Sequence, residues 1–226
     1  MILNLFSIFD PSTKIFSLNW ISTFIGLFFI PQIYWLIRSR LIFLIINFII
    51  ILWIEFKIIL KNNFNINNLL FYISLFLFII INNFIGLFPY IFTRSSHLIY
   101  SLRLSLPIWL GLIIFGWLKN TNFIFVHLVP QGTPFVLIFF IVLIERLSNI
   151  IRPFTLSIRL TANIIAGHLL LTLLRSFVPD FFLFYLVILI LQLILLILEV
   201  SVSLIQSYVF VILIILYLKE TNYDKI

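Results

Sequence analysis

The sequence predicts an all-α, polytopic integral membrane protein of about five to six helices, the last two of which form a long, steeply tilted hairpin. Of its 226 residues, 64% are hydrophobic and only 9% are charged. Soluble domains have about 45–50% apolar and about 25% charged residues, so this chain has too little polar surface to fold in water. Its net charge of +7 therefore does not indicate nucleic acid, and we expect the positive residues to set membrane topology instead.

The first two hydrophobic runs differ in length. Ile15–Ile37 is long enough to cross a bilayer, which takes about 20 apolar residues, and Arg38 ends it. The next run, which begins at residue 41, remains apolar for 14 residues and then reaches Glu55 and Lys57. The sequence therefore predicts a membrane span over 15–37 and an interfacial helix over 41–60.

Two further runs precede the long hairpin. Residues 69–92 and 98–118 each have the length of a span, and Arg94 follows the first. The segment 127–134 contains Pro130, Gly132 and Pro134, which interrupt helices. We expect two spans followed by a loop.

The C-terminal part of the chain holds two runs that are too long for upright spans. Residues 135–174 and 181–218 comprise 40 and 38 residues, so a continuous first helix would measure roughly 60 Å at 1.5 Å per residue. Ordinary spans tilt about 20° in a hydrocarbon core of about 30 Å, so helices of this length must tilt steeply. A break at Pro153, giving pairs of single spans, stays open as an alternative.

Lysine and arginine are distributed unequally over the two sides of the membrane. If each run crosses once and 41–60 does not cross, side one, which carries the N-terminus, receives three cationic residues and side two receives seven. The positive-inside rule assigns side two to the matrix or cytoplasm. The residues on side two are Arg38, Arg40, Lys57, Lys61, Lys119, Lys219 and Lys225, and those on side one are Lys14, Arg94 and Arg175.

The first long helix carries a polar stripe. Its members are separated by 4, 3, 7 and 4 residues, which places them along one helical face. Charged groups inside a membrane are costly and indicate function. The only two alanines of the chain lie on the same face, where small residues permit close approach of another helix. The stripe consists of Glu145, Asn149, Arg152, Arg159 and Asn163, and the alanines are Ala162 and Ala166.

The second long helix has a matching polar face, made of Gln192, Glu199, Ser203 and Gln206. In an antiparallel hairpin the two faces can meet. Along the first helix, His168 lies about 13 Å and Glu145 about 21 Å from Arg159, in opposite directions. Glutamate and histidine can exchange protons, whereas arginine stays charged, so a proton path along these groups would be interrupted at Arg159. The alternative is that Glu145, Arg152 and Glu199 join ion pairs that hold the helices together.

The residues from Arg159 to His168, Arg-Leu-Thr-Ala-Asn-Ile-Ile-Ala-Gly-His, resemble the hallmark of subunit a of the F-type ATP synthase, in its insect-like mitochondrial form. The resemblance covers nearly the whole chain. Its other segments are Phe9-Asp-Pro-Ser-Thr13, Asn83-Phe-Ile-Gly-Leu-Phe-Pro-Tyr90, His127-Leu-Val-Pro-Gln-Gly-Thr-Pro134, Ser148-Asn-Ile-Ile-Arg-Pro153 and Gln206-Ser-Tyr-Val-Phe210.

This resemblance implies a stator subunit of the mitochondrial inner membrane that is not an enzyme on its own. Such a subunit conducts protons through two offset half-channels to a rotating ring of carboxylate-bearing c subunits, beside other stator subunits. By position, Arg159 is implied to face the ring carboxylate, His168 with Glu199 to line one half-channel, and Glu145 to serve the other.

The resemblance also places Gln206 near the arginine. From the spacings, Asn163 and Ser203 are added to the proton path, and Ala162 and Ala166 to the rotor contact. The sequence departs from the family's pattern at four arginines, Arg94, Arg103, Arg146 and Arg175.

Two alternatives from other classes remain. An autonomous ion or solute transporter would commonly show internal repeats, but here the two halves differ. A respiratory-complex subunit that binds haem would need facing histidines, and the three histidines lie far apart at 97, 127 and 168. We therefore expect no cofactor and no metal, and as partners the c-ring, other stator subunits, lipid and protons, with no nucleic acid.

Overall fold

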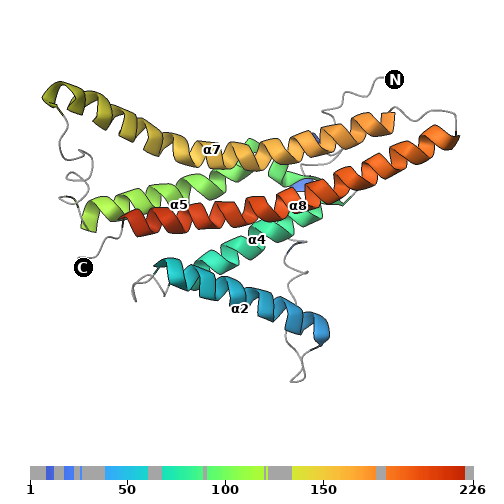
Figure 1. Cartoon of the computed structure of the whole chain (residues 1–226), viewed down its shortest axis with the longest axis horizontal. Coiled ribbons are helices and arrows are strands. Elements are labelled where there is room, and N and C mark those ends of the chain that lie inside the picture. The colour runs from blue at the N-terminus through green and yellow to red at the C-terminus, as the bar shows by residue number, and fades with distance from the viewer. Residues whose placement is uncertain are drawn as a thin grey trace.

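The computed structural model describes residues 9–12, 18–22, 26, 39–60, 68–88, 91–119, 121, 134–176 and 182–221. The described residues form helices joined by short connections, and none of them forms a strand (Figure 1). The all-α prediction is therefore confirmed. In chain order the elements are η2 (Leu18–Ile21), α2 (Arg40–Leu60), α4 (Leu69–Leu87), η3 (Arg94–Ser96), α5 (Leu98–Lys119), α7 (Phe135–Ser176) and α8 (Phe182–Thr221).

Four of the described helices are long and apolar enough to cross a membrane. They are α2, α4, α5 and α8, over 42–60, 69–87, 98–119 and 184–219. The chain is thus a multi-pass membrane protein. Helix α7 is not among the four, and its sequence carries Glu145 and four arginines.

The structure leaves two expectations about the N-terminal part as predictions. Helix α2 coincides with the interfacial helix expected over 41–60, but its apolar length would also allow it to cross. Most of the span expected over 15–37, and most of the loop expected over 127–134, lie outside the described residues.

Helix α4 ends five residues before its expected end at residue 92. Its C-cap, Phe88, has an extended backbone with ψ 135°. The next residue is Pro89, and the residue before a proline avoids the helical region because the ring clashes with it. The chain then turns through η3 and returns as α5.

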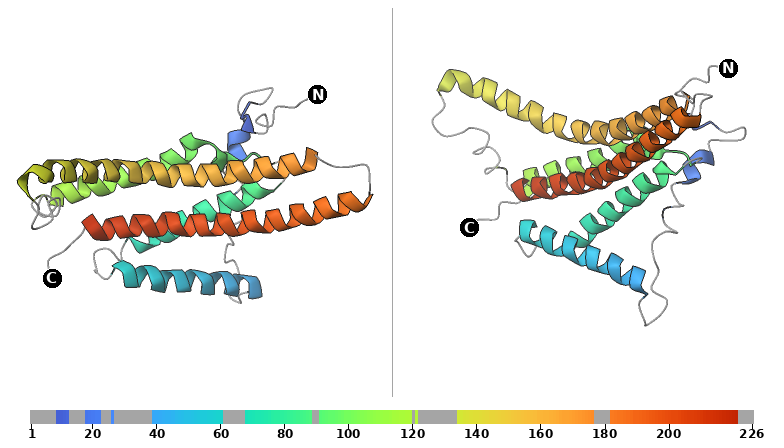
Figure 2. Two further views of the ribbon diagram at one scale, coloured as in Figure 1. Left: turned by 45° about the horizontal axis from the view of Figure 1, so that its top comes forward. Right: turned by 45° about the vertical axis from the view of Figure 1, so that its right-hand side comes forward.

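The hairpin consists of two unbroken helices of 42 and 40 residues. Helix α7 continues through Pro153, so the alternative break at this residue does not occur. At 1.5 Å per residue α7 is about 63 Å long, twice the thickness of a hydrocarbon core. Figure 2 shows α7 and α8 close together toward the end of α7 and farther apart toward its beginning, with α7 curved in the right view.

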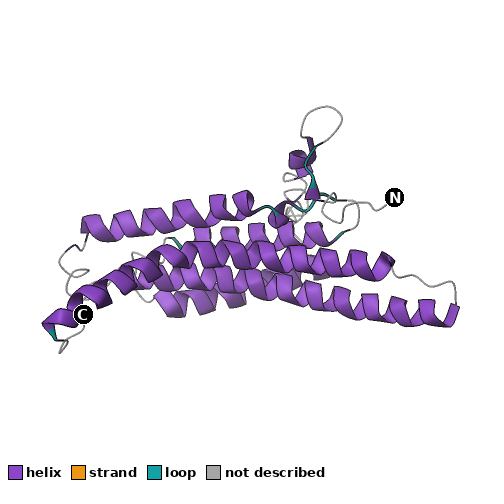
Figure 3. Cartoon of the chain, turned by 90° about the horizontal axis from the view of Figure 1, so that it is seen from above, coloured by secondary structure: helices purple, strands orange, loops and turns teal. Residues whose placement is uncertain are grey.

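Helices α5, α7 and α8 run lengthwise along the molecule, which therefore has two ends (Figures 1 and 3), whereas α2 and α4 cross each other at an angle (Figure 1). Helices α5 and α8 finish, and α4 and α7 begin, at the same end in Figure 1. That end carries Lys119 and Lys219, while Arg94 and Arg175 belong to elements at the opposite end. These four residues agree with the separation of charges expected from the sequence, whereas Arg40, expected on side two, begins α2 toward the other end in Figure 1. We keep the terms side two and side one for the two ends.

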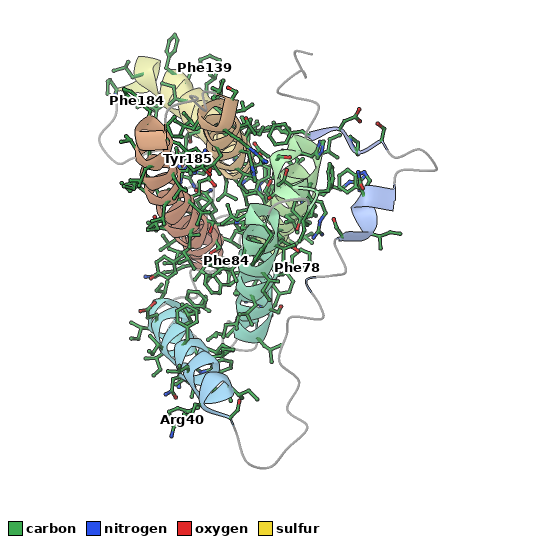
Figure 4. The ribbon with its side chains drawn as sticks, turned by 90° about the vertical axis from the view of Figure 1, so that its right-hand side faces the viewer. Arg40, Phe78, Phe84, Phe139, Phe184 and Tyr185 are labelled. Atoms are coloured by element: carbon green, nitrogen blue, oxygen red, sulfur yellow. The ribbon has the colours of Figure 1, made fainter. Side chains whose placement is uncertain are left out.

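One apolar core joins four of the helices. Phe56 of α2, Leu69 of α4, Leu160 of α7 and Phe210 of α8 are each at most 1% exposed and belong to one cluster. The outer surface of the hairpin is apolar as well, and Figure 4 labels Phe139 and Phe184 there, which are 70% and 61% exposed. An outer surface of this kind suits contact with lipid.

Candidate functional site

One member of the α7 polar stripe, Asn163, meets the polar face of α8 near the middle of the hairpin. The Asn163 side-chain nitrogen donates a hydrogen bond of 3.4 Å to the Gln206 side-chain oxygen. Gln206 is buried, as are Glu199 and Ser203 on the same face of α8. The three positions are spaced by 4 and 3 residues, so one helical face points them all toward the interior.

Glu199 lies directly against the backbone of α7 at Gly167. A Cβ atom built on Gly167 would overlap the Glu199 carboxylate oxygen and would lie only 2.6 Å from its carboxyl carbon. Real Cβ atoms essentially never approach another atom within 3.0 Å. The carboxylate can therefore occupy this position only because residue 167 has no side chain.

A cavity of about 240 Å³ lies between α4, α7 and α8. It could hold roughly eight waters at about 30 Å³ each. Most of its wall is aliphatic. Its polar lining is Asn83, Asn163, Glu199, Ser203 and Gln206, beside the small residues Ala166 and Gly167.

Three polar atoms in the lining of this cavity are buried without a hydrogen-bond partner. They are the side-chain nitrogens of Asn83 and Gln206 and one carboxylate oxygen of Glu199. A buried polar atom without a partner costs about 1–3 kcal/mol. Water in the cavity would satisfy these atoms, since buried waters bind where two to four polar groups converge.

His168 occupies the side-one end of the same region. It is half-buried, its ring meets Phe9 edge-on at 6.3 Å between centroids, and it interacts with the backbone of Gly86. Its Nε2 atom has no partner among the described residues. The structure thus places His168 next to Gly167, the glycine that Glu199 contacts, with no hydrogen bond between the His168 and Glu199 side chains.

Arg159 points away from the interior of the chain. It is exposed, together with Ala162, Asn163 and Ala166, while Leu160 and Thr161 on the opposite face of α7 are buried. No carboxylate of the described segments is in ion-pair contact with it. The exposed face therefore presents one cation surrounded by small side chains.

The remaining polar residues of α7 lie apart from this group. Glu145 is half-buried and, by helix rise, about 21 Å from Arg159. The Arg152 guanidinium stacks over the ring of Tyr217 on α8 at 4.9 Å. This contact joins α7 to α8 through an aromatic ring. Arg146 similarly lies 5.5 Å from the Trp117 ring.

Sequence reasoning assigned no role to two residues of the site. Asn83 on α4 is 2% exposed and lines the cavity, and an asparagine inside an apolar span is the signal that could have found it. Gly167 stands within the hallmark segment, but its contact with Glu199 depends on how two helices pack, which spacing along one helix does not reveal.

A second polar cluster surrounds Arg94 on side one. The guanidinium donates to the Ser22 carbonyl at 2.8 Å and to the Asn82 side-chain oxygen at 3.2 Å. The Asn82 nitrogen donates to the Tyr100 hydroxyl at 2.7 Å. Burial lowers the pKa of the Arg94 guanidinium because desolvation penalises the charged form. This cluster ties η3 to α4, α5 and the segment at residue 22.

The described residues contain no group of three or more His, Cys, Asp or Glu that could hold a metal ion. The site consists of an outward-facing arginine, a mostly aliphatic cavity with five polar lining residues, and titratable groups displaced toward both ends of the hairpin.

Comparison with known proteins identifies the family. A family profile described as "ATP synthase A chain" matches residues 16–219. Proteins named "ATP synthase subunit a" from Anopheles gambiae, Aedes aegypti and Drosophila melanogaster are 53%, 52% and 52% identical to this chain. Each alignment covers 98% of this chain and 100% of the relative. The chain belongs to the ATP synthase subunit a family.

Proposed function

We propose that this chain is the proton-conducting stator subunit of the membrane sector of a mitochondrial ATP synthase, and that Arg159 faces the carboxylates of a rotating c-ring. Two offset half-channels would deliver protons to these carboxylates and remove them on the other side. Proton flow would thereby drive rotation and ATP synthesis, while the chemistry of ATP formation would take place on other subunits.

The observation that carries the proposal is the exposure of Arg159 beside Ala162 and Ala166. An arginine inside a membrane is costly unless it meets an anion, and none of the described carboxylates contacts it. Small side chains one and two turns away leave room for another helix. A ring helix that carries a carboxylate would supply both the partner charge and the close contact.

The side-one half-channel would use the cavity between α4, α7 and α8. His168 and Glu199 can gain and lose protons, and Asn163, Ser203 and Gln206 can hold water by hydrogen bonding. A proton entering from side one would pass these groups and neutralise a ring carboxylate. The neutral group could then rotate into lipid at low cost, because burying a charged group there is expensive.

Glu145 would serve the side-two half-channel, since it lies on the far side of Arg159 along α7. Arg159 would hold each arriving carboxylate ionised by charge pairing. It would also separate the two half-channels, because arginine does not release its proton in proteins. Each proton that crosses 100 mV supplies about 2.3 kcal/mol, so several are needed for each ATP.

The same proposal places the chain in the mitochondrial inner membrane, with the c-ring and other membrane-sector stator subunits as partners. Side two, which holds most of the lysines, would face the matrix. Family membership leaves the autonomous transporter and the haem-binding respiratory subunit without support.

The proposal is tested by purifying the chain under mild detergent conditions from mitochondria. We expect it to copurify with a ring of small hairpin subunits, each with one carboxylate in a membrane helix, and with an ATP-hydrolysing assembly. In a second experiment, the chain alone is reconstituted in vesicles and its transport of ions and solutes is measured. Solute or ion transport by the isolated chain, with no ring in the native preparation, would contradict the proposal.

A further inference from the structure

A hydrogen bond joins two titratable side chains that the proposed half-channels do not use. The Tyr208 hydroxyl of α8 donates to a carboxylate oxygen of Glu55 on α2 at 3.1 Å. Glu55 is half-buried, at the edge of the face through which Leu52 and Phe56 enter the core. Tyr208 is 36% exposed. The pair therefore lies at the margin of the α2–α8 contact, within reach of groups outside the chain.

Glu55 is one of three carboxylates that lie in the described helices away from their first and last turns. The other two, Glu145 and Glu199, belong to the proposed half-channels. Helix α4, the other neighbour of α2, has no charged residue, and α8 has none between Glu199 and Lys219. The nearest charged residue along α2 is Lys57, which is exposed. Glu55 thus brings a single acid to a stretch of α8 that has no charge of its own.

The depth of this acid along the hairpin matches that of Arg159. The hydrogen bond between Asn163 and Gln206 shows that these two residues lie at the same position along the axis of the hairpin. From that level Tyr208 lies about 3 Å and Arg159 about 6 Å toward side two, because the helices are antiparallel and rise 1.5 Å per residue. Their axial levels therefore differ by about 3 Å, whereas Glu145 lies about 21 Å from Arg159.

We propose that Glu55, held in place by Tyr208, accepts the proton that a ring carboxylic acid releases near Arg159 and passes it to water on side two. This inference rests on the proposed function and adds a third acid to it. Glu55 stands on α2 two residues before Lys57, which the sequence assigns to side two, the side on which the proton must leave.

The proposed step moves one proton and no electrons between groups. The O–H bond of the ring carboxylic acid breaks and leaves a carboxylate, which pairs with Arg159. The proton travels through water to a Glu55 oxygen, where a new O–H bond forms, and Glu55 later gives it to water on side two. Tyr208 stabilises the ionised acceptor between transfers by donating its hydroxyl hydrogen.

The test uses the assembled complex in vesicles, with the ATP-forming head removed and a potential imposed, and measures passive proton conduction per assembled complex. Glu55→Gln removes the group that accepts the proton and should lower conduction by at least roughly tenfold, since a positioned acid or base typically contributes about 100-fold or more to the rate of proton transfer. Glu55→Asp keeps the acid and should retain more conduction than Glu55→Gln. Conduction equal to the wild type in Glu55→Gln would overturn the inference, as would equal losses in both variants.

Matched controls separate this role from simple packing. Lys57→Gln removes a charge two residues away on α2 and should leave conduction unchanged. Tyr208→Phe should lower conduction, whereas Tyr185→Phe, at an exposed tyrosine near the start of the same helix, should not. If Glu55→Gln fails to assemble, the conduction of Tyr208→Phe becomes the test. Normal conduction in that variant would overturn the inference.

The outcome also distinguishes this inference from the proposed function. Loss of coupled ATP synthesis in Arg159→Ala, with normal conduction in Glu55→Gln, would remove Glu55 from the path and leave the stator proposal intact. Normal coupled synthesis in Arg159→Ala would remove both.

Discussion

Replacing Gly167 with alanine tests whether the Glu199 carboxylate must lie against the backbone of α7. The added Cβ atom would overlap a Glu199 oxygen and would lie 2.6 Å and 2.9 Å from its carboxyl and γ carbons. Ordinary contact begins at 3.4 Å, so the carboxylate must move away by roughly 1 Å. A displacement of about 1 Å in a site that depends on positioning can cost about 100-fold in rate.

We therefore expect Gly167→Ala to lower ATP synthesis by the assembled complex by about 10- to 100-fold. Gly111→Ala is the matched control, since a Cβ atom there would meet nothing within 4 Å. The assay is ATP synthesis in vesicles under an imposed proton gradient, divided by the amount of assembled subunit. A double variant, Gly167→Ala with Glu199→Asp, shortens the acid by one methylene and should recover part of the rate.

Two results would refute this reasoning. Wild-type synthesis in Gly167→Ala would mean that the carboxylate does not need its position against α7. Equal losses in Gly167→Ala and Gly111→Ala would mean that membrane helices of this chain tolerate alanine poorly in general, independent of Glu199.

Two further predictions concern the cavity and the hairpin. Asn83→Leu should leave the thermal stability of the assembled subunit unchanged or raise it, because an unpaired buried amide costs about 1–3 kcal/mol. The same variant should lower ATP synthesis, because it removes a group that holds water in the cavity. Unchanged synthesis would exclude Asn83 from the path. The hydrogen bond between Asn163 and Gln206 is tested by a double-mutant cycle of Asn163→Ala and Gln206→Ala, in which the free energy of unfolding is measured in detergent. The summed losses of the two single variants should differ from that of the double variant by about 0.6 kcal/mol, the average for hydrogen bonds between membrane helices. Strictly additive losses would contradict the contact.

The lengths of the helices could be predicted from the sequence because hydrophobic runs and charges mark where a chain can lie in a bilayer. Proline was less informative. Pro89 accounts for the early end of α4, because the residue before it must be extended. Pro153, in contrast, lies inside the continuous α7, which shows that tertiary packing can override the local preference of one residue.

The polar residues of the site could be located along each helix by their spacing, but not across helices. Spacing groups Glu199, Ser203 and Gln206 on one face, and all three are buried. Spacing also groups Arg159 with Arg152, yet Arg159 is exposed while Arg152 stacks on Tyr217. The identity of the neighbouring helix decides this difference, and no periodicity within α7 encodes it.

The contribution of the third helix lay beyond sequence reasoning for the same reason. Asn83 reaches the cavity because α4 packs against α8, and Glu55 meets Tyr208 across 153 positions of the chain. Contacts between residues so distant in the sequence depend on the angles at which helices cross, which follow from side-chain packing over the whole interface.

The most direct test of the central claim is to measure coupled ATP synthesis and passive proton conduction in the same membranes carrying Arg159→Ala. Arg175→Ala is the control, since Arg175 is an exposed arginine near the end of the same helix. If Arg159 pairs with the ring carboxylate and separates the half-channels, synthesis is lost while protons still cross the membrane sector, and Arg175→Ala behaves as the wild type. Normal coupled synthesis in Arg159→Ala would contradict the account.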